Sequence, residues 1–401
     1  MKNRALIHTG LTVVIPILIK VFAIKFLSEN IELNIYGIIA IIETITLGLT
    51  QVLLSVPVQS FNRFYNESKN KEKIINEFKT SIYFSSLLII LILPPLYIVS
   101  FDDISIKSII LSVLYAILIN NYSSKQNILI ISFKRKIYMI FQVSESLTKI
   151  SFPIFGYLLL RSLDGYLLGL VLSGLVMNAF ISIYTKSNFK RLIKISDFKK
   201  YILFAYPILI TTFAAWSISF SDRFLIKTFI SNEALGKYSL LAQLAAMGQI
   251  LGSIFTLYVN PIILELYESN KKEAYLKLSN YLLNLVFLSL LVLIFVFLLP
   301  IDFISLFINK TIISENYYVF IILVVSIIFA ILQNSISLYF VLEKKLLLHA
   351  KFYIAVAIIN IILNFSLISY GIIGLSIATL VSYILLTILM TFAFLKGKID
   401  S

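Results

Sequence analysis

The sequence has no cysteine among its 401 residues, and it has only two histidines and one tryptophan. The lack of cysteine excludes a disulfide framework and a cysteine nucleophile, and the shortage of both cysteine and histidine argues against a zinc or iron-sulfur site. Charge is scarce as well, because only 13% of the residues are charged. We therefore expect neither a metal nor a cofactor.

What the chain has in excess is apolar side chains. Hydrophobic residues make up 59% of the sequence, and the mean hydropathy is +0.96, which is more apolar surface than a soluble domain of this length can bury. The net charge of +14 would suggest nucleic acid in a soluble protein, but in a membrane protein basic residues first report topology. We expect an integral membrane protein without a nucleic-acid partner.

Twelve apolar stretches are long enough to cross a bilayer core, which needs about 20 residues of helix. Backbone groups must be paired inside the segment in lipid, so stretches of this length predict helices rather than strands. The fold class we predict is an all-α integral membrane protein. The predicted spans are 8–28, 34–58, 80–100, 104–124, 138–160, 164–185, 201–228, 235–262, 278–300, 316–341, 350–369 and 371–395.

The N-terminus mimics a signal peptide, because basic residues precede an apolar region from Leu11 to Leu27. No small-residue cleavage site follows, so we interpret the region as the first membrane helix. Most of the 34 Lys and Arg residues lie in the two termini and the even-numbered connections between spans. Basic residues near span ends are retained in the cytoplasm, which predicts that both termini are cytoplasmic.

The longest basic connection, from Lys186 to Lys200, separates six predicted helices from six. The motif Ile15-Pro-Ile-Leu-Ile19 of the first span reappears as Tyr206-Pro-Ile-Leu-Ile210 in the seventh. Tyr36-Gly37, Glu43 and Gly48 likewise align, at a constant offset, with Gly236-Lys237, Gln243 and Gly248. These matches predict two six-helix halves, 1–195 and 196–401, around a central cavity of the kind in which transporters bind substrate.

A few ionisable side chains lie inside or beside the apolar spans. Each costs on the order of 2.5 to 3.5 kcal/mol at the bilayer centre, so such groups normally face a bundle interior or a wet cavity. They are Lys20, Lys25, Glu43, Glu145, Lys149, Asp222, Arg223 and Lys227.

The first span contributes Lys20, which follows the helix-breaking Pro16, and Lys25. Both are candidate cavity cations, and the alternative is that they extend along their stems to the membrane interface. Glu43 has no partner nearby in sequence, so it either pairs with a lysine of the first span or titrates in an ion-coupled cycle.

The fifth span carries Glu145 and Lys149 four residues apart, on one helical face, where they could neutralise each other or serve the cavity. In the seventh span Asp222 and Arg223 fall near the outer boundary, and Arg223 and Lys227 share a face. That face either continues a cationic, water-lined surface or anchors the helix at the interface.

No motif for catalysis accompanies these charges. The sequence has no glycine-rich phosphate loop after a strand-like segment, no pair of carboxylates in an extended loop, and no long external connection. We therefore expect a protein that is not an enzyme, and a polytopic glycan polymerase or ligase is disfavoured.

Several of these features together resemble Wzx-type polysaccharide (O-antigen) flippases of the MOP exporter superfamily. The features are Tyr36-Gly37, Arg63-Phe-Tyr65, Ala205-Tyr-Pro207, and Ser221-Asp-Arg-Phe224 followed by Gly236-Lys-Tyr-Ser239. The superfamily also contains MATE drug exporters and lipid II flippases. The latter have two further helices, for which this chain has no room.

The resemblance implies a MATE-like bundle in the bacterial inner membrane. It implies alternating access that moves an undecaprenyl-diphosphate-linked oligosaccharide to the outer leaflet, driven by H+ or Na+, in lipopolysaccharide or other surface-polysaccharide biosynthesis. Membrane lipids and the polysaccharide polymerase machinery are the further partners. Fixed cations suit a diphosphate, so Lys20, Lys25, Lys149, Arg223 and Lys227 are predicted to bind substrate. Glu43, Glu145 and Asp222 are predicted to couple ions or pair charges. The alternative is a MATE-like ion-coupled exporter of small molecules.

Overall fold

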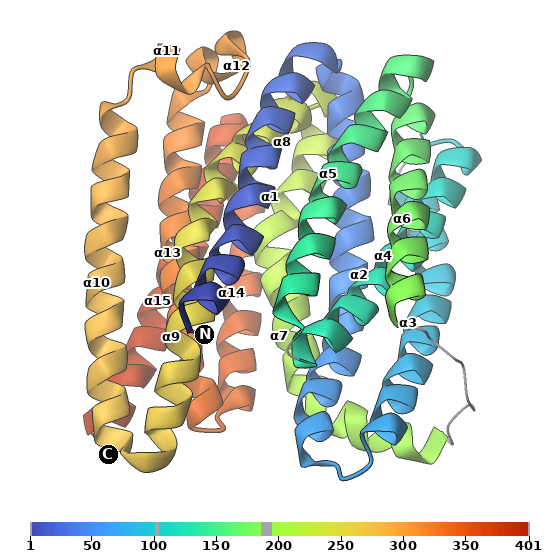
Figure 1. Cartoon of the computed structure of the whole chain (residues 1–401). Coiled ribbons are helices and arrows are strands. Elements are labelled where there is room, and N and C mark those ends of the chain that lie inside the picture. Colours follow the sequence, from blue (N-terminus) through green and yellow to red (C-terminus); the bar gives the residue numbers. More distant parts are fainter. Residues whose placement is uncertain (1, 101–103, 133, 186–194, 400–401) are drawn as a thin grey trace. The chain divides into compact units, whose positions relative to one another are not determined.

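The computed structural model describes residues 2–100, 104–132, 134–185 and 195–399. The first nine residues of the predicted linker, 186–194, therefore lie outside the described residues. The described residues form helices joined by short connections and contain no strand (Figure 1). The predicted fold class, an all-α membrane protein, is confirmed.

Each predicted span has a helical counterpart, and the helices extend beyond the apolar stretches. The counterparts are α1 (Lys2–Asn30), α2 (Leu33–Glu67), α3 (Lys71–Ser100), α4 (Ile106–Ile131), α5 (Arg135–Leu160), α6 (Leu163–Thr185), α7 (Ile195–Phe229), α8 (Asn232–Ala245) with η1 (Ala246–Gly248) and α9 (Gln249–Ser269), α10 (Lys271–Leu298), α13 (Tyr317–Leu342), α14 (Leu346–Leu367) with η2 (Ile368–Tyr370), and α15 (Gly371–Ile399).

Two features were not predicted. A 3-10 turn, η1, interrupts the eighth span, and two short helices, α11 (Ile301–Ile304) and α12 (Lys310–Glu315), precede α13.

Capping residues explain why several helices begin outside the apolar stretches. Asn70 accepts a hydrogen bond from the Lys73 amide at 3.0 Å, and Asn270 accepts one from the Glu273 amide at 3.1 Å. Such side chains satisfy amide groups that the first helical turn leaves unpaired. The polar first turns of α3 and α10 are therefore helical, although only the apolar residues that follow were predicted to be.

Length and apolar composition identify the membrane-crossing helices. Within the described residues, eight helical stretches are long and apolar enough to span a bilayer. One of them, Leu346–Lys398, contains both α14 and α15. The chain is a multi-pass membrane protein.

The chain divides into two compact units. Unit 1 contains Met1–Lys20 and Ile38–Phe213, and unit 2 contains Val21–Gly37 and Ala214–Ser401. Helices α1, α2 and α7 thus contribute residues to both units. This division is by spatial contact, whereas the predicted halves, 1–195 and 196–401, follow the internal sequence repeat and stay a prediction.

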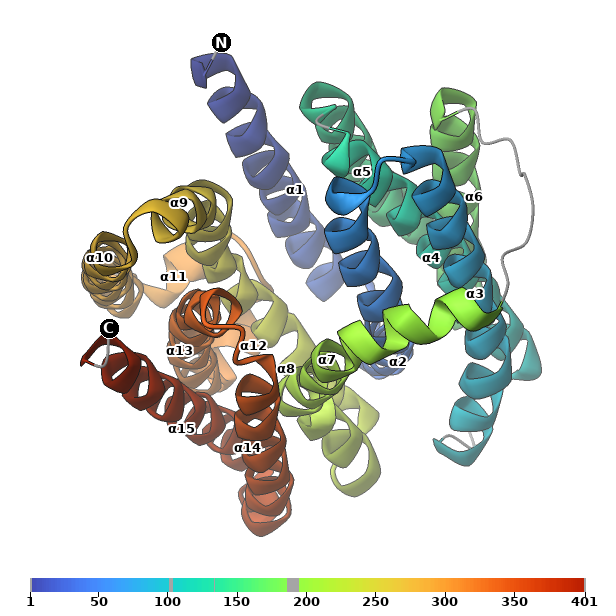
Figure 2. The same ribbon diagram turned by 90° about the horizontal axis from the view of Figure 1, so that it is seen from below.

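Close backbone contact joins α5 to α6 in unit 1. A Cβ atom on Gly165 would lie 2.4 Å from the Gly156 carbonyl oxygen, and one on Gly169 would lie 2.2 Å from that of Phe152. Small residues let membrane helices approach closely. Helix α4 packs on α6, and α3 packs on α4, which completes a four-helix bundle (Figure 2).

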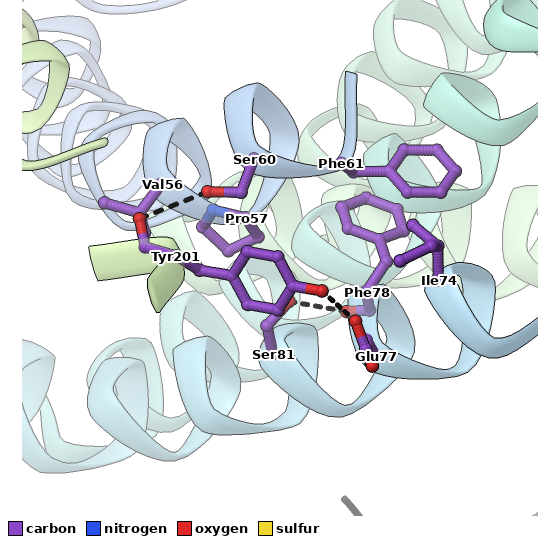
Figure 3. Close-up of a pocket in the computed structure, with 9 residues that line it drawn as sticks. All are labelled: Val56, Pro57, Ser60, Phe61, Ile74, Glu77, Phe78, Ser81 and Tyr201. Carbon is purple, nitrogen blue, oxygen red and sulfur yellow. Dashed lines mark hydrogen bonds between the residues drawn. The ribbon is translucent and has the colours of Figure 1, made fainter. Parts of the chain in front are cut away.

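The first part of α7 is tied to unit 1 by Tyr201 (Figure 3). The Tyr201 hydroxyl donates to the buried Glu77 carboxylate of α3, and the Tyr201 carbonyl accepts a hydrogen bond from Ser60 of α2 at 3.3 Å. Three residues further along α7, the Phe204 ring lies 4.5 Å from the Arg63 guanidinium. This cation-π contact and the two hydrogen bonds fix the start of α7 against α2 and α3.

In unit 2 the first turn of α2 packs directly on the first turns of α8. A Cβ on Gly37 would lie 2.0 Å from the Asn232 carbonyl oxygen, and one on Gly236 would lie 2.3 Å from that of Leu33. Gln243 also donates to the Tyr36 hydroxyl at 2.7 Å. Gly37 and Gly236 therefore sit at one helix crossing.

A polar cluster joins the ends of α9, α10 and α13, which pack together in unit 2 (Figure 2). Glu343, just after α13, accepts hydrogen bonds from Tyr267 at 2.6 Å and from Tyr275, and it forms an ion pair with Lys271 at 2.9 Å. Burial disfavours the charged carboxylate, but these hydrogen bonds outweigh that cost and lower the pKa of Glu343 to about 2. The cluster is a structural tie outside the membrane-spanning segments.

Candidate functional site

Unit 1 brings three of the predicted site residues together from two helices. Lys149 of α5 interacts electrostatically with Glu145 of the same helix, with Glu43 of α2 and with the Tyr115 hydroxyl of α4. Glu43 also accepts a hydrogen bond from Tyr166 of α6 at 3.2 Å. One cation and two carboxylates thus share the interior of unit 1. Sequence reasoning offered a lysine of the first span as the partner of Glu43 and did not consider Lys149 in that role.

Glu145 is held by an amide of a neighbouring helix. Gln126 of α4 donates to its carboxylate at 3.1 Å and to the Tyr122 hydroxyl at 2.9 Å. Glu145, Lys149 and Tyr122 line a small cavity of about 20 Å³, which is room for one water molecule. Each charge therefore has a partner besides the other, Gln126 for Glu145 and Tyr115 for Lys149, and whether the pair serves the cavity or only neutralises itself stays a prediction.

A second pocket of unit 1 is lined by neutral polar groups. It has a volume of about 410 Å³, within the usual range of ligand sites. Hydroxyl and amide side chains of α2, α4 and α7 lie along an otherwise aliphatic wall. They are Thr50, Gln51, Ser55, Gln59, Ser123 and Thr212. Such groups both donate and accept hydrogen bonds, as the hydroxyls of a sugar require.

In unit 2 Asp222 is the buried centre of a polar cluster, with an exposed fraction of 2%. Its carboxylate accepts hydrogen bonds from the Tyr238 hydroxyl of α8, from Thr379 of α15 at 3.3 Å, and from the Arg223 amide at 2.7 Å. All three partners donate, so the site is built for the ionised carboxylate. Asp222 therefore ties α7 to α8 and α15.

Two asparagines of α14 extend this cluster. Ser221 donates to the Asn360 side-chain oxygen Oδ1 at 2.8 Å, and the Asn364 side-chain amide donates to the Ser221 hydroxyl at 3.0 Å. Asn360 also donates to Ser382 of α15 at 3.0 Å. Both asparagines are fully buried, so the polar serine face of α7 meets polar groups of α14 and α15.

The remaining cations of α7 and α1 are placed differently. The half-buried Arg223 lies with its guanidinium 4.6 Å from the Phe220 ring, a cation-π contact with its own helix. Lys227, one turn further, is also half-buried, and Lys20 of α1 is exposed. Their predicted contact with substrate stays a prediction.

Lys25 holds a loop of unit 2. Its ammonium group donates to the Ser305 and Ile308 carbonyl oxygens at 2.7 and 3.3 Å and pairs with Glu29 at 2.7 Å. Ser28 of α1 accepts a hydrogen bond from the Asn309 amide in the same connection at 2.9 Å. Lys25 thereby fixes the segment between α11 and α12, and its predicted contact with substrate stays a prediction.

Sequence reasoning assigned no site role to Tyr238, Thr379, Asn360 or Asn364, although Tyr238 stands in the stretch Gly236-Lys-Tyr-Ser239 that carried the family resemblance. The two asparagines carried a signal, because they lie four residues apart in an otherwise apolar helix, and amides inside lipid normally find partners on neighbouring helices. Hydroxyl groups gave no comparable signal, since Ser, Thr and Tyr are common throughout these helices.

The fold defines the class of protein: a multi-pass, all-helical membrane protein. The structure resembles that of the lipid II flippase MurJ in an inward closed conformation, with a TM-score of 0.70 and 16% identity. That match covers 98% of this chain and 87% of the other.

Two other transporters of the same superfamily have a similar fold. An inward-facing MATE multidrug resistance transporter matches with a TM-score of 0.68 and 13% identity, over 98% of this chain and 96% of the other. A MOP superfamily transporter from Pyrococcus furiosus matches with a TM-score of 0.58 and 15% identity, over 97% and 95%. The predicted resemblance to transporters of this superfamily is thereby confirmed for the fold.

The sequence itself assigns the family. Residues 36–267 match the family model described as polysaccharide biosynthesis protein, and the chain belongs to that family. No curated protein matches the sequence.

Proposed function

We propose that this protein flips an undecaprenyl-diphosphate-linked oligosaccharide from the cytoplasmic to the outer leaflet of the bacterial inner membrane. Membership of the polysaccharide biosynthesis family carries the proposal, and the fold shared with a lipid II flippase supports it. The protein acts as a transporter rather than an enzyme, with both termini in the cytoplasm, and serves the assembly of O-antigen lipopolysaccharide. It works beside the polysaccharide polymerase machinery.

In this proposal cations bind the diphosphate and neutral groups bind the sugars. Lys20, Lys25, Lys149, Arg223 and Lys227 are the proposed phosphate ligands, because a diphosphate crossing a low-dielectric barrier needs fixed positive charge. The pocket of hydroxyl and amide groups in unit 1 offers sugar hydroxyls the hydrogen bonds they lose on leaving water. Alternating access exposes these groups to each side in turn.

Glu43, Glu145 and Asp222 are the proposed ion-coupling or charge-pairing groups. Glu43 and Glu145 share the interior of unit 1 with Lys149, so binding H+ or Na+ at either carboxylate changes how strongly Lys149 is held. An ion that binds one state of the bundle better than the other drives the exchange between states. When a carboxylate binds the ion, Lys149 is released to bind phosphate, and when the ion leaves, the carboxylates hold Lys149 again.

Complementation of a flippase deletion tests the proposal. Lys20→Ala, Lys149→Gln and Arg223→Ala should each abolish surface glycan at normal protein abundance, and the exposed Lys136→Gln should support wild-type levels. Purified protein in vesicles should move the lipid-linked oligosaccharide to the outer leaflet, at a rate that depends on a proton or sodium gradient. Full complementation by all three variants would overturn the cation assignment. Extrusion of cationic dyes without glycan transfer would favour the drug-exporter alternative.

A further inference from the structure

A large pocket of unit 1 is unused by the proposed transport function. It has a volume of about 670 Å³ and lies among α3, α4 and α6, which pack side by side (Figure 2). Its lining divides into a polar end and a remainder that is apolar except for Ser86. The polar end contains Lys79, Asn121, Ser124, Lys125, Ser182 and Thr185.

The polar end is strongly cationic. Lys79 and Lys125 lie close enough to repel each other electrostatically, and no acidic residue lines the pocket. Lys125 donates to Ser182 at 2.7 Å, which fixes its position, and Lys79 forms no ion pair within the described part of the chain. Two ammonium groups without a carboxylate between them favour an anion.

The cationic end lies at one level of the membrane. Lys79 immediately precedes the apolar stretch 80–100, and Lys125 immediately follows the apolar stretch 104–124. Thr185 ends α6. Because all three helices change from apolar to polar here, this end of the pocket falls at the boundary between hydrocarbon and headgroups.

The apolar remainder extends from that boundary into the hydrocarbon. It runs along α3 to Leu87 and Ile90, and Ile90 is about 16 Å beyond Lys79 at the helical rise per residue. Tyr83, Leu87 and Ile90 are 47%, 54% and 46% exposed. The pocket is therefore open along its side, where lipid chains lie.

We propose that this pocket binds an anionic phospholipid. The phosphate lies between Lys79 and Lys125, with the Asn121 side-chain amide as a neutral donor, and an acyl chain lies along Tyr83, Leu87 and Ile90. Two cations lie at the headgroup level, and an apolar floor formed by Tyr83, Leu87 and Ile90 lies in the hydrocarbon. Together they select a phosphate carried on a hydrocarbon chain. Free phosphate would leave the apolar floor uncovered, and a neutral lipid would leave the cations uncompensated.

Native mass spectrometry of the full chain with phosphatidylglycerol tests the site. Juxtamembrane lysines contribute about 1 kcal/mol each to anionic lipid binding, so K79Q with K125Q should weaken binding on the order of 30-fold. K69Q with K136Q is the matched control, because it removes two exposed charges of unit 1 and should leave binding unchanged. L87W narrows the apolar floor, keeps both lysines, and should also weaken binding.

Competition by other ligands distinguishes a phospholipid from other molecules that carry a phosphate. Inorganic phosphate and phosphatidylcholine should each compete at least tenfold less well than phosphatidylglycerol. Equal loss of binding in the control variant, or no loss in K79Q with K125Q, overturns the proposal. Undecaprenyl phosphate that binds more tightly than phosphatidylglycerol, with the same dependence on both lysines, also overturns it and makes the pocket a substrate site.

Discussion

The Asp222 carboxylate of α7 gives the sharpest test of how unit 2 is held together. It accepts hydrogen bonds from the Tyr238 hydroxyl, from Thr379 and from the Arg223 amide while almost fully buried. Tyr238→Phe removes one donor and keeps the ring. Asp222→Ala removes the acceptor and leaves the Tyr238 and Thr379 hydroxyls buried without it.

The magnitudes follow from the number of hydrogen bonds lost. A hydrogen bond to a charged group contributes about 1.5 to 3 kcal/mol, and an unsatisfied buried donor costs about 1 to 3 kcal/mol. We therefore expect Tyr238→Phe to lower the free energy of unfolding by about 1.5 to 3 kcal/mol, and Asp222→Ala by about 2 to 6 kcal/mol. For a unit of roughly 200 residues, such as unit 2, a loss of about 1 kcal/mol in the free energy of unfolding lowers Tm by about 2 to 4 °C.

The chain provides its own probe for the measurement. Its single tryptophan, Trp216, lies on α7 two turns before Asp222 and contacts the Phe224 ring at 6.0 Å. Thermal unfolding followed by Trp216 fluorescence should show a Tm lower by about 3 to 12 °C for Tyr238→Phe. Tyr318→Phe, at a 76% exposed tyrosine of unit 2, is the control and should not shift Tm measurably.

The double variant decides whether the two residues act together. Because both single changes break the same hydrogen bond, their effects should fall short of additivity by about 1.5 kcal/mol or more. Additive effects would show that the Tyr238 hydroxyl does not stabilise Asp222, and the account of the cluster would then be wrong.

Two further predictions concern unit 2. Gly37→Val should lower Tm by several degrees and reduce membrane abundance, because a Cβ at Gly37 would lie 2.0 Å from the Asn232 carbonyl oxygen. Gly248→Ala is the control and should be tolerated, because a Cβ there makes ordinary contacts only. Equal effects of the two changes in immunoblots and unfolding scans would contradict the close-packing account. The low pKa of Glu343 predicts stability that is fully present above about pH 4.5 and is lost as pH falls towards 2. Acid should therefore lower the Tm of the wild type more than that of Glu343→Gln, and parallel pH profiles would refute this.

Much of the fold could be predicted from the sequence because lipid leaves the backbone few options. Apolar runs of bilayer length must be helices, and each predicted span has a helical counterpart. The ends were less predictable, since side chains such as Asn70 and Asn270 extend helices past the apolar runs by capping them. The short helices α11 and α12 had no periodic signal to indicate them.

The sequence by itself determined which charges lie inside the apolar helices, because a charged residue within an apolar run can be recognised from the order of residues alone. Only the tertiary structure decided their partners: Lys149 interacts with Glu43, which lies about 100 residues away along the chain, while Lys25 holds a loop near Ser305. Asp222 depends on Tyr238 and Thr379, and nothing in the sequence pairs either hydroxyl with this carboxylate. The physical reason is that the cost of burying a charge depends on the residue itself, whereas the hydrogen bonds and opposite charges that offset this cost come from the helices that pack against it.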